Sequence, residues 1–402
     1  MLHNIQEALR RRLLKDKKLY RFFSPLLGVE PNMIMRFARR GGVDMNMVVF
    51  SSYQGRAYND NPRYISEALH ELRPQSDIVW LFKDIEAVKK QYDVPSYVRC
   101  VPHGTVEELR ALGRARVWVD NWRKLDYLKV GKDQEYIFSP HYDRVLKTGV
   151  LGSQDFFFKR LCEEHATLCV AGSEFGAGLF EPGYRYRGPV MTVGTPRNDI
   201  LVRNDPADEA RIRARLGVDA DTRLLLYAPT FRGKARDQSA KQEVALDLEH
   251  ILDVLEECTG EKWRCLHRAH YYSPGLSVAE SGRMIDATGY PEMAELMRVA
   301  DAMISDYSSC IGDFLLRKKP VWLYHADFED YVENDRAMRI NLDETPYWRA
   351  KTPAELDALI RATTPESAAA NCQALLDYYK TREFGHSAEE VAKYIAAKMD
   401  RK

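Results

Sequence analysis

The residues with the clearest chemical potential lie at positions 304–313, where the sequence reads Ile-Ser-Asp-Tyr-Ser-Ser-Cys-Ile-Gly-Asp. The pattern predicts a short buried strand followed by Ser308 and Ser309 at the start of a helix. Hydroxyl groups and the first N–H groups of a helix can hold an anion such as phosphate. Two serines also cap ordinary helices, so both interpretations stay open from these residues alone. Asp313, one helical turn after Ser309, could bind a ligand hydroxyl or simply face solvent.

Basic residues follow predicted strands at two other points of the chain. Arg197 stands in the segment Thr-Pro-Arg-Asn-Asp at 195–199, and Arg232 follows Ala-Pro-Thr at 228–230. A guanidinium group presents paired N–H donors that match phosphate oxygens, so both side chains are candidates to bind a diphosphate. Either could instead form an ion pair between two domains.

Two histidines follow predicted strands. His141 comes after the strand predicted at 136–138, and Lys147 stands six residues further along. A neutral imidazole suits a general base because its ordinary pKa lies near neutral pH. From spacing alone, His141 could also be a loop residue without a role. Asp143 could orient His141 or cap a turn, and we favour the turn.

The second histidine, His270, lies just past the strand predicted at 263–266. Arg268 precedes it by two residues, and His267 is a neighbour that could compete for the same role. A histidine in either place can stabilise an anion by a hydrogen bond or a positive charge.

Two series of short apolar segments must position these residues. The first series lies at 48–50, 78–82, 117–119, 136–138, 168–170 and 190–193, and the second at 224–227, 263–266, 284–286, 302–305 and 321–324. Strands that alternate with helices predict mostly parallel sheets with right-handed crossovers. The fold class is therefore α/β, with two Rossmann-like domains facing a cleft and a hinge near 201–210. Ligands of such sheets bind beyond the carboxyl ends of the strands.

The composition excludes several classes of protein. The chain has 402 residues, with 59 basic and 59 acidic side chains, so no overall charge favours nucleic acid as a partner. Seven cysteines without a C-x-x-C pair argue against a disulfide framework and a structural zinc site, and favour a reducing cytoplasm. No apolar run reaches the roughly 18 residues that a membrane-spanning helix needs, and no signal peptide is evident.

The first 45 residues form a basic amphipathic segment. It mixes Arg10, Arg11, Arg12, Lys17 and Lys18 with apolar pairs. Such a segment can lie on an anionic bilayer or pack on the protein itself. Prolines within it argue against one long helix.

The order of these motifs resembles the CDP-glycerol glycerophosphotransferases, the enzymes that prime and polymerise teichoic acids. The resemblance runs from about residue 48 to about 336 and is strongest from Gly194 onward. It is carried by the segments at 193–199, 224–232, 266–272, 304–313 and 320–331, with weaker support from 50–55, 59–63 and 115–121.

The resemblance implies a glycosyltransferase-B fold, with an acceptor domain at 46–203 and a CDP-polyol donor domain with terminal helices at 204–402. It implies that His141 takes the proton of the acceptor hydroxyl and that His270 contacts the donor diphosphate. Lys147, Arg197, Arg232 and Arg268 would bind substrate, together with Ser308, Ser309 and Asp313. The expected partners are CDP-glycerol, an undecaprenyl-diphosphate-linked saccharide and the cytoplasmic face of the cell membrane.

The loop after His141 departs from the family pattern. Pro140 precedes the histidine, and Tyr142, Asp143 and Arg144 follow it, where polymerases usually have tryptophan before and small residues after. The acceptor and the polyol are therefore open, and the alternatives are a CDP-ribitol or capsule-polymer transferase, a nucleotide-sugar glycosyltransferase and a non-catalytic membrane scaffold. The short amino-terminal region favours a primase over a polymerase.

A metal or cofactor is not expected. The motifs contain no Asp-x-Asp pair and no histidine or cysteine cluster with metal-ligand spacing. The segment Asn-Asp-Asn-Pro-Arg at 59–63 is interpreted as a turn that begins a helix.

Overall fold

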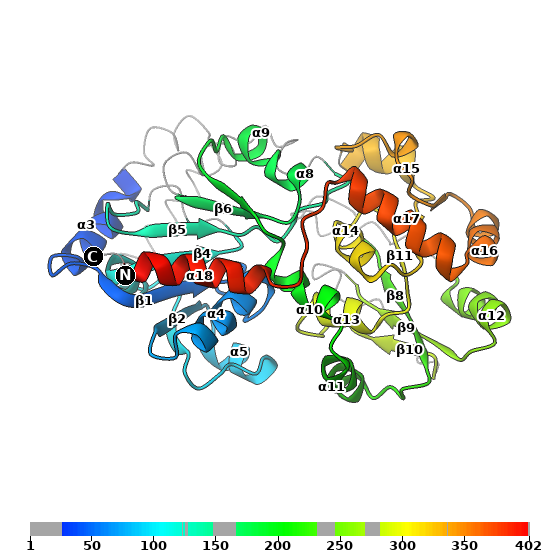
Figure 1. Ribbon diagram of the computed structural model, residues 1–402, viewed down its shortest axis with the longest axis horizontal. Coiled ribbons are helices and arrows are strands. Elements are labelled where there is room, and N and C mark those ends of the chain that lie inside the picture. The colour runs from blue at the N-terminus through cyan, green and yellow to red at the C-terminus, as the bar shows by residue number, and fades with distance from the viewer. Residues whose placement is uncertain are drawn as a thin grey trace.

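Two parallel sheets, each covered by helices, lie side by side along the long axis of the molecule (Figure 1). The computed structural model describes residues 26–122, 124, 128–147, 166–230, 246–269, 282–335 and 337–400. The predicted pair of Rossmann-like α/β domains is confirmed, because both sheets are parallel and alternate with helices along the chain.

The first sheet has the strand order β3-β2-β1-β4-β5-β6-β7 in the described part of the chain. Its strands are β1 (Asp44–Ser51), β2 (Asp77–Phe82), β3 (Arg99–Pro102), β4 (Ala115–Asp120), β5 (Glu135–Phe138), β6 (Leu168–Ala171) and β7 (Val190–Thr192). The helices of this part are α3 (Val29–Ala38), α4 (Asp60–Leu72), α5 (Ile85–Gln91), α6 (Val106–Arg114), α8 (Glu174–Ala177) and α9 (Phe180–Tyr184). Every residue of β4 is buried, as expected for a central strand covered on both faces.

The second sheet has the order β10-β9-β8-β11-β12-β13. Its strands are β8 (Arg223–Ala228), β9 (Trp263–His267), β10 (Met284–Asp286), β11 (Ala302–Ser305), β12 (Val321–Tyr324) and β13 (Arg349–Ala350). In both sheets the order of the strands reverses beside the first strand, between β1 and β4 and between β8 and β11. Folds of this kind bind ligands at this switch point.

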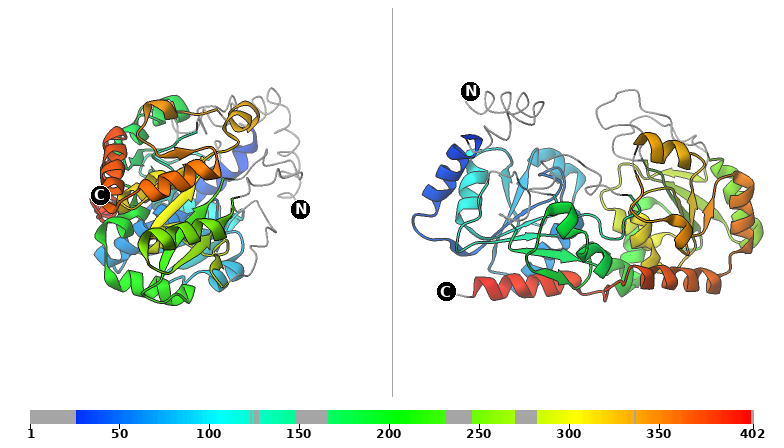
Figure 2. Two further views of the ribbon diagram at one scale, coloured as in Figure 1. Left: turned by 90° about the vertical axis from the view of Figure 1, so that its right-hand side faces the viewer. Right: turned by 90° about the horizontal axis from the view of Figure 1, so that it is seen from above.

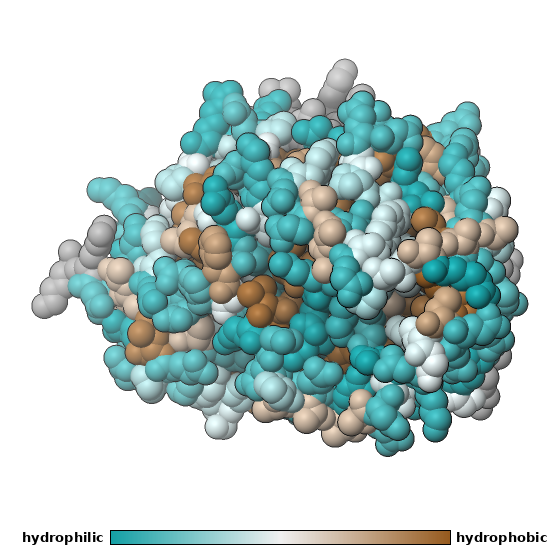
Figure 3. All heavy atoms as spheres, turned by 45° about the vertical axis from the view of Figure 1, so that its right-hand side comes forward, coloured by the Kyte–Doolittle hydropathy of each residue, from teal (hydrophilic) through white to brown (hydrophobic). Residues whose placement is uncertain are grey.

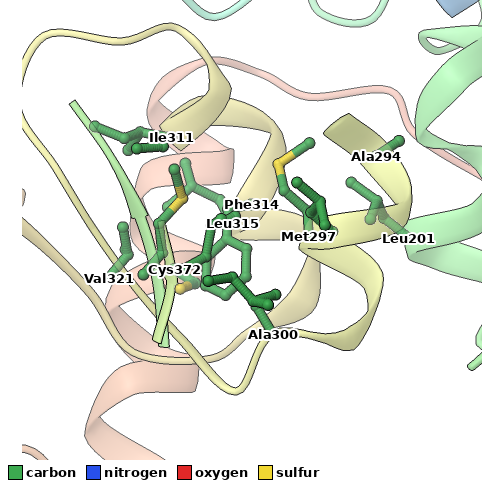
Figure 4. Close-up of a cluster of buried hydrophobic side chains, with 14 of the residues drawn as sticks. Leu201, Ala294, Met297, Ala300, Ile311, Phe314, Leu315, Val321 and Cys372 are labelled. Carbon is green, nitrogen blue, oxygen red and sulfur yellow. The ribbon is translucent and has the colours of Figure 1, made fainter. Parts of the chain in front are cut away.

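The second domain buries one large apolar cluster on a face of its sheet. Figure 4 shows Met297, Phe314, Leu315 and Cys372 of four helical segments in one cluster, with Val321 of β12 beside them. The helices and short helical turns that follow β7 along the chain are η2 (Pro196–Asn198), α10 (Asp199–Arg203), α11 (Pro206–Leu216), α12 (Leu248–Thr259), α13 (Met293–Val299), α14 (Cys310–Phe314), η3 (Leu315–Arg317), α15 (Phe328–Asp330), η4 (Tyr331–Asp335), η5 (Leu342–Glu344), α16 (Pro353–Ala362), α17 (Pro365–Tyr378) and α18 (Ser387–Met399).

The last helix returns to the first domain. In Figures 1 and 2, α18 lies along the first domain while α17 stays on the second. Val391 and Ile395 of α18 share a buried cluster with Ile65 of α4 and Val48 of β1. The domain boundaries predicted from the sequence assign all terminal helices to the second domain. Helix α18 does not follow this prediction, because its apolar face packs on α4 of the first domain. The change of sheet falls between β7 and β8, which brackets the hinge predicted at 201–210.

Helix α3 lies at the end of the first domain that is farthest from the second domain (Figures 1 and 2). Its buried residue Met35 faces α6, where a Cβ atom at Gly113 would come within 2.6 Å of the Met35 carbonyl oxygen. Glycine is therefore needed for this close approach. Among the described residues, no helix is long and apolar enough to cross a membrane. The face in Figure 3 is mainly hydrophilic, with separate apolar patches.

Candidate active site

His141 lies at the carboxyl edge of the first sheet, just after β5. The neighbouring strands β4 and β1 end beside it, and their following residues Trp122 and Tyr53 supply its ring contacts. The imidazole stacks on Trp122 with ring centroids 5.2 Å apart, and the Tyr53 ring lies 5.3 Å from it. Three strands thus fix the ring of a half-buried histidine.

The surroundings of His141 favour its neutral form. Burial lowers the pKa of His141, and the nearby charge of Arg197 lowers it further, while Asp60 and the backbone oxygen of Asn121 act in the opposite direction. Nδ1 lies 3.5 Å from the main-chain oxygen of Asn121. If Nδ1 carries the proton and donates it to this oxygen, Nε2 keeps a lone pair and can act as a base.

The turn after β1 is held in an unusual backbone conformation. Tyr53 and Gln54 have φ angles of 46° and 58°, in the left-handed region. The side chain of Asn121 accepts a hydrogen bond from Tyr53 N at 2.8 Å and donates one to Ser52 Oγ at 3.1 Å. The end of β4 therefore holds the turn after β1 in place.

Helix α4 begins at this edge, as predicted for the segment 59–63, and its first residues reach both domains. The main-chain N–H of Asp60 donates to Glu292 of the second domain at 2.8 Å. The carboxylate of Asp60 accepts from the Tyr53 hydroxyl at 2.7 Å and pairs with Arg197 at 3.4 Å. The pKa of Glu292 is raised to about 7, mainly by burial and to a smaller extent by the negative charge of Asp60. Asp60 therefore stands between the histidine site and the second domain.

Arg197 and Asp313 are brought together in a buried ion pair across the domain interface. Arg197 Nη2 donates to Asp313 Oδ2 at 2.7 Å, and both side chains are at most 7% exposed. Asn198 Nδ2 donates to Asp313 Oδ1 at 2.9 Å. Burial alone would raise the pKa of Asp313, but Arg197 and Arg144 hold it below its ordinary value. Asp313 thus has firm protein partners and does not face solvent.

Arg144, from the loop after His141, completes this interdomain cluster. It pairs with Asp313 at 2.7 Å and with Glu383 at 3.1 Å. Its Nε donates to the carbonyl oxygen of Gly312 at 2.8 Å, where an added Cβ would meet the Arg144 side chain at 2.5 Å. Asp143 accepts from Gly172 N at 2.7 Å and from the Ser173 hydroxyl, so it ties the loop after His141 to the segment that begins α8.

The predicted serine pair stands at the start of α14, as expected. Ser309 is the residue before the helix, and its side chain makes no capping hydrogen bond there. Ser308 Oγ accepts from the Cys310 thiol at 3.0 Å. Burial raises the pKa of Cys310 to about 12, and the charge of Lys147 acts in the opposite direction. Lys147 therefore lies close enough to this first turn for its charge to act there. Its main chain forms an isolated β-bridge with Met338.

Of the three predicted residues that remain, the structure describes Arg268. Arg268 Nη1 donates to the carbonyl oxygens of Ala287, Thr288 and Tyr290 at 2.6 to 2.7 Å, so it holds the turn after β10. His270 and Arg232 lie outside the described residues.

Several residues around the site were not selected from the sequence. Asp60, Tyr53 and Trp122 surround or face His141, and Arg144 and Glu383 hold the domain interface. The tryptophan and tyrosine had one usable signal, because each follows the end of a predicted strand. Asp60 and Glu383 had none, since only the tertiary fold brings them to their partners.

Comparison with known proteins assigns the chain to a family. The sequence model described as "CDP-Glycerol:Poly(glycerophosphate) glycerophosphotransferase" matches residues 33–397. The chain belongs to this family. The resemblance noted from the motifs is therefore confirmed.

Relatives within the glycerophosphotransferase family include a teichoic acid glycerol-phosphate transferase of Staphylococcus aureus (strain NCTC 8325 / PS 47), which is 27% identical over 72% of this chain and 77% of that protein. A teichoic acid poly(glycerol phosphate) polymerase of Bacillus subtilis (strain 168) is 26% identical over 98% of this chain. The chain spans 54% of the length of that polymerase.

The fold of this family member matches a solved structure. The wall teichoic acid polymerase TagF superposes with a TM-score of 0.77 at 23% identity, over 96% of this chain and 98% of that one. The expected glycosyltransferase-B type of fold is confirmed by this match. The likeness concerns the fold alone.

Proposed function

We propose that this chain transfers glycerol phosphate from CDP-glycerol to a hydroxyl of a lipid-linked saccharide and releases CMP. The acceptor oxygen forms a bond to the β-phosphorus of CDP-glycerol. The bond from that phosphorus to the bridging oxygen breaks, and CMP leaves with the electron pair. His141 takes the proton of the acceptor hydroxyl.

The observation that carries this proposal is the setting of His141. Its imidazole lies at the carboxyl edge of the first sheet, its pKa is lowered by burial, and it is within electrostatic range of Arg197. Arg197 in turn pairs with Asp313 of α14 in the second domain. A neutral base therefore stands close to the surface where the two domains meet, which is where a two-domain enzyme of this fold binds its substrates.

The donor would bind along the second domain. Ser308 and Ser309 at the start of α14, with Lys147 nearby, offer hydroxyl and ammonium groups to a diphosphate. His270, Arg232 and Arg268 remain predicted donor contacts. Arg197 and Asp313 were predicted to bind the donor, but their ion pair supports a structural role. Because this pair is buried between the domains, it fixes the position of α14 relative to His141.

Release of CMP tests this proposal. Purified protein is given CDP-glycerol or CDP-ribitol, with and without an undecaprenyl-diphosphate-linked disaccharide, and CMP and product length are measured. We expect CMP from CDP-glycerol that depends on the acceptor. Acceptor-dependent CMP from CDP-ribitol alone would name ribitol as the polyol, and the product length separates one addition from polymerisation. No CMP from either donor would contradict the proposal and favour a nucleotide-sugar glycosyltransferase.

We further propose that the amino-terminal part of the chain contacts the cytoplasmic face of the membrane. Val29, Met33 and Phe37 of α3 succeed one another at intervals of four residues, and each is more than half exposed. Arg36 and Arg40 are exposed beside them. Apolar side chains next to cations on one helix suit the interface of an anionic bilayer.

Charge substitution on α3 is expected to weaken membrane binding. The double variant Met33→Asp, Phe37→Asp replaces two apolar contacts by anions, and we expect at least a tenfold loss of binding to vesicles that contain phosphatidylglycerol. Phe384→Asp, at a residue 58% exposed elsewhere on the surface, is the matched control. Vesicle co-sedimentation measures the effect. Equal binding by the double variant and the control would contradict the assignment of α3 as the contact.

A further inference from the structure

We propose that Asp60 is a positioning residue for His141: its carboxylate holds the Tyr53 ring against the imidazole and stabilises the imidazolium that forms when His141 takes a proton. This inference rests on the proposed function of His141 as the base. It concerns a residue that the sequence motifs assigned only to the start of a helix.

The backbone places Asp60 for this task. Asp60 has a φ angle of 58°, and Tyr53 has one of 46°. Residues other than glycine rarely adopt this region, and those that do cluster at functional sites. The two turns bring the Tyr53 hydroxyl to 2.7 Å from Asp60 Oδ2.

A chain of contacts leads from the carboxylate to the imidazole. Tyr53 donates to Asp60 through its hydroxyl, and its ring lies 5.3 Å from the ring of His141. Asn121 anchors both ends, since its side chain accepts from Tyr53 N at 2.8 Å and its main-chain oxygen lies 3.5 Å from His141 Nδ1. Moving the Asp60 carboxylate would therefore release the tyrosine ring from the histidine.

The charges around the pair are defined. Asp60 faces Arg197 at 3.4 Å, and Glu292 accepts the Asp60 main-chain N–H. Burial and Asp60 raise the pKa of Glu292, and the charge of Arg63 acts in the opposite direction. His141 faces the rings of Tyr53, Trp122 and Tyr142, and Asp60 and Arg197 act on its pKa in opposite directions. The positive charge that appears on His141 during proton transfer would thus meet Arg197 as well, so a nearby carboxylate is needed to offset it.

The decisive variant is Asp60→Asn. Asparagine tolerates a positive φ angle and keeps the size of the side chain, so the main effect is loss of charge. We expect the pKa of His141 to fall, because the carboxylate that favours the charged form is gone. The acidic limb of the pH profile of CMP release should move to lower pH, while the plateau rate falls about tenfold or more because the base is weaker.

Two further variants separate positioning from general damage. Tyr53→Phe keeps the ring and removes the hydroxyl contact with Asp60, and we expect a smaller fall of kcat with little change in KM for the donor. Asp313→Asn removes the charge of the other carboxylate that contacts Arg197 but leaves Asp60 in place. This control should lower the pKa of His141 less than Asp60→Asn does, because Asp60 acts on His141 directly and Asp313 only through Arg197.

The measurement is an NMR titration of histidine-labelled full-length protein, with the signal of His141 identified by its loss in His141→Gln. It needs no turnover, so it remains valid if the proposed transfer reaction is wrong. A lower pKa in Asp60→Asn than in the wild type and in Asp313→Asn supports the inference. An unchanged or higher pKa in Asp60→Asn overturns it, whatever happens to the rate.

Discussion

Replacing His141 by alanine is expected to lower the rate of acceptor-dependent CMP release roughly 1,000-fold, the size of effect typical of a lost general base. The reason lies in its surroundings. Trp122 and Tyr53 hold the ring, burial lowers its pKa, and Asp60 and Arg197 are the charged side chains that act on that pKa. Without the imidazole, no neighbouring group named in these contacts is a neutral base.

Binding of the donor should survive this substitution. Ser308 and Ser309 belong to the second domain, whereas His141 follows β5 of the first. Isothermal titration with CDP-glycerol is expected to give an affinity within about threefold of the wild type, a difference of less than 1 kcal/mol. CMP release and binding measured on one preparation would separate loss of chemistry from loss of substrate.

His250→Ala is the matched control for this experiment. His250 is exposed, lies on α12 and pairs with Asp357 at 2.7 Å. We expect its removal to leave CMP release unchanged. A His141→Ala enzyme with near-normal turnover would show that another group takes the proton, and the assignment of the base would be wrong.

The sequence was sufficient for the fold because the strands that matter are buried apolar runs. The predicted strands at 284–286, 302–305 and 321–324 coincide with β10, β11 and β12. Strands β3 and β13 were not predicted. Both lie at the edges of their sheets, and β13 has two residues, so neither carries the continuous apolar run on which the prediction depends.

The site could be predicted only in part, for a physical reason. The positions of His141 and Ser309 could be predicted because each follows a strand, and local sequence patterns define strands and helix starts. The partner of a buried charge is defined by the tertiary fold alone. Arg197 is 116 residues away from Asp313, and nothing between them marks the pair. For the same reason, the sequence left both an ion pair and a phosphate contact open for Arg197.

Replacing Asp313 by alanine is expected to cost about 3–5 kcal/mol of stability, as does removal of one partner from other buried ion pairs. The change would leave the guanidinium groups of Arg144 and Arg197 buried without the carboxylate that both contact at 2.7 Å. Neither arginine can lose its charge to relieve this. Asp313→Asn keeps an oxygen for one of them and should cost less. Urea unfolding measures both variants.

Glu181→Ala provides the matched control, because Glu181 also pairs with an arginine at 2.8 Å but both side chains are more than 60% exposed. A pair in water contributes about 0–1 kcal/mol, so its loss should hardly move the unfolding curve. The same experiment decides between two roles for Asp313. If Asp313→Ala unfolds like the control while KM for CDP-glycerol rises strongly, the carboxylate is a ligand for a donor hydroxyl, as the motif implied. If stability falls by several kcal/mol in both the presence and the absence of donor, the Asp313 carboxylate fixes α14 to the domain that carries His141. The geometry of transfer then depends on this ion pair.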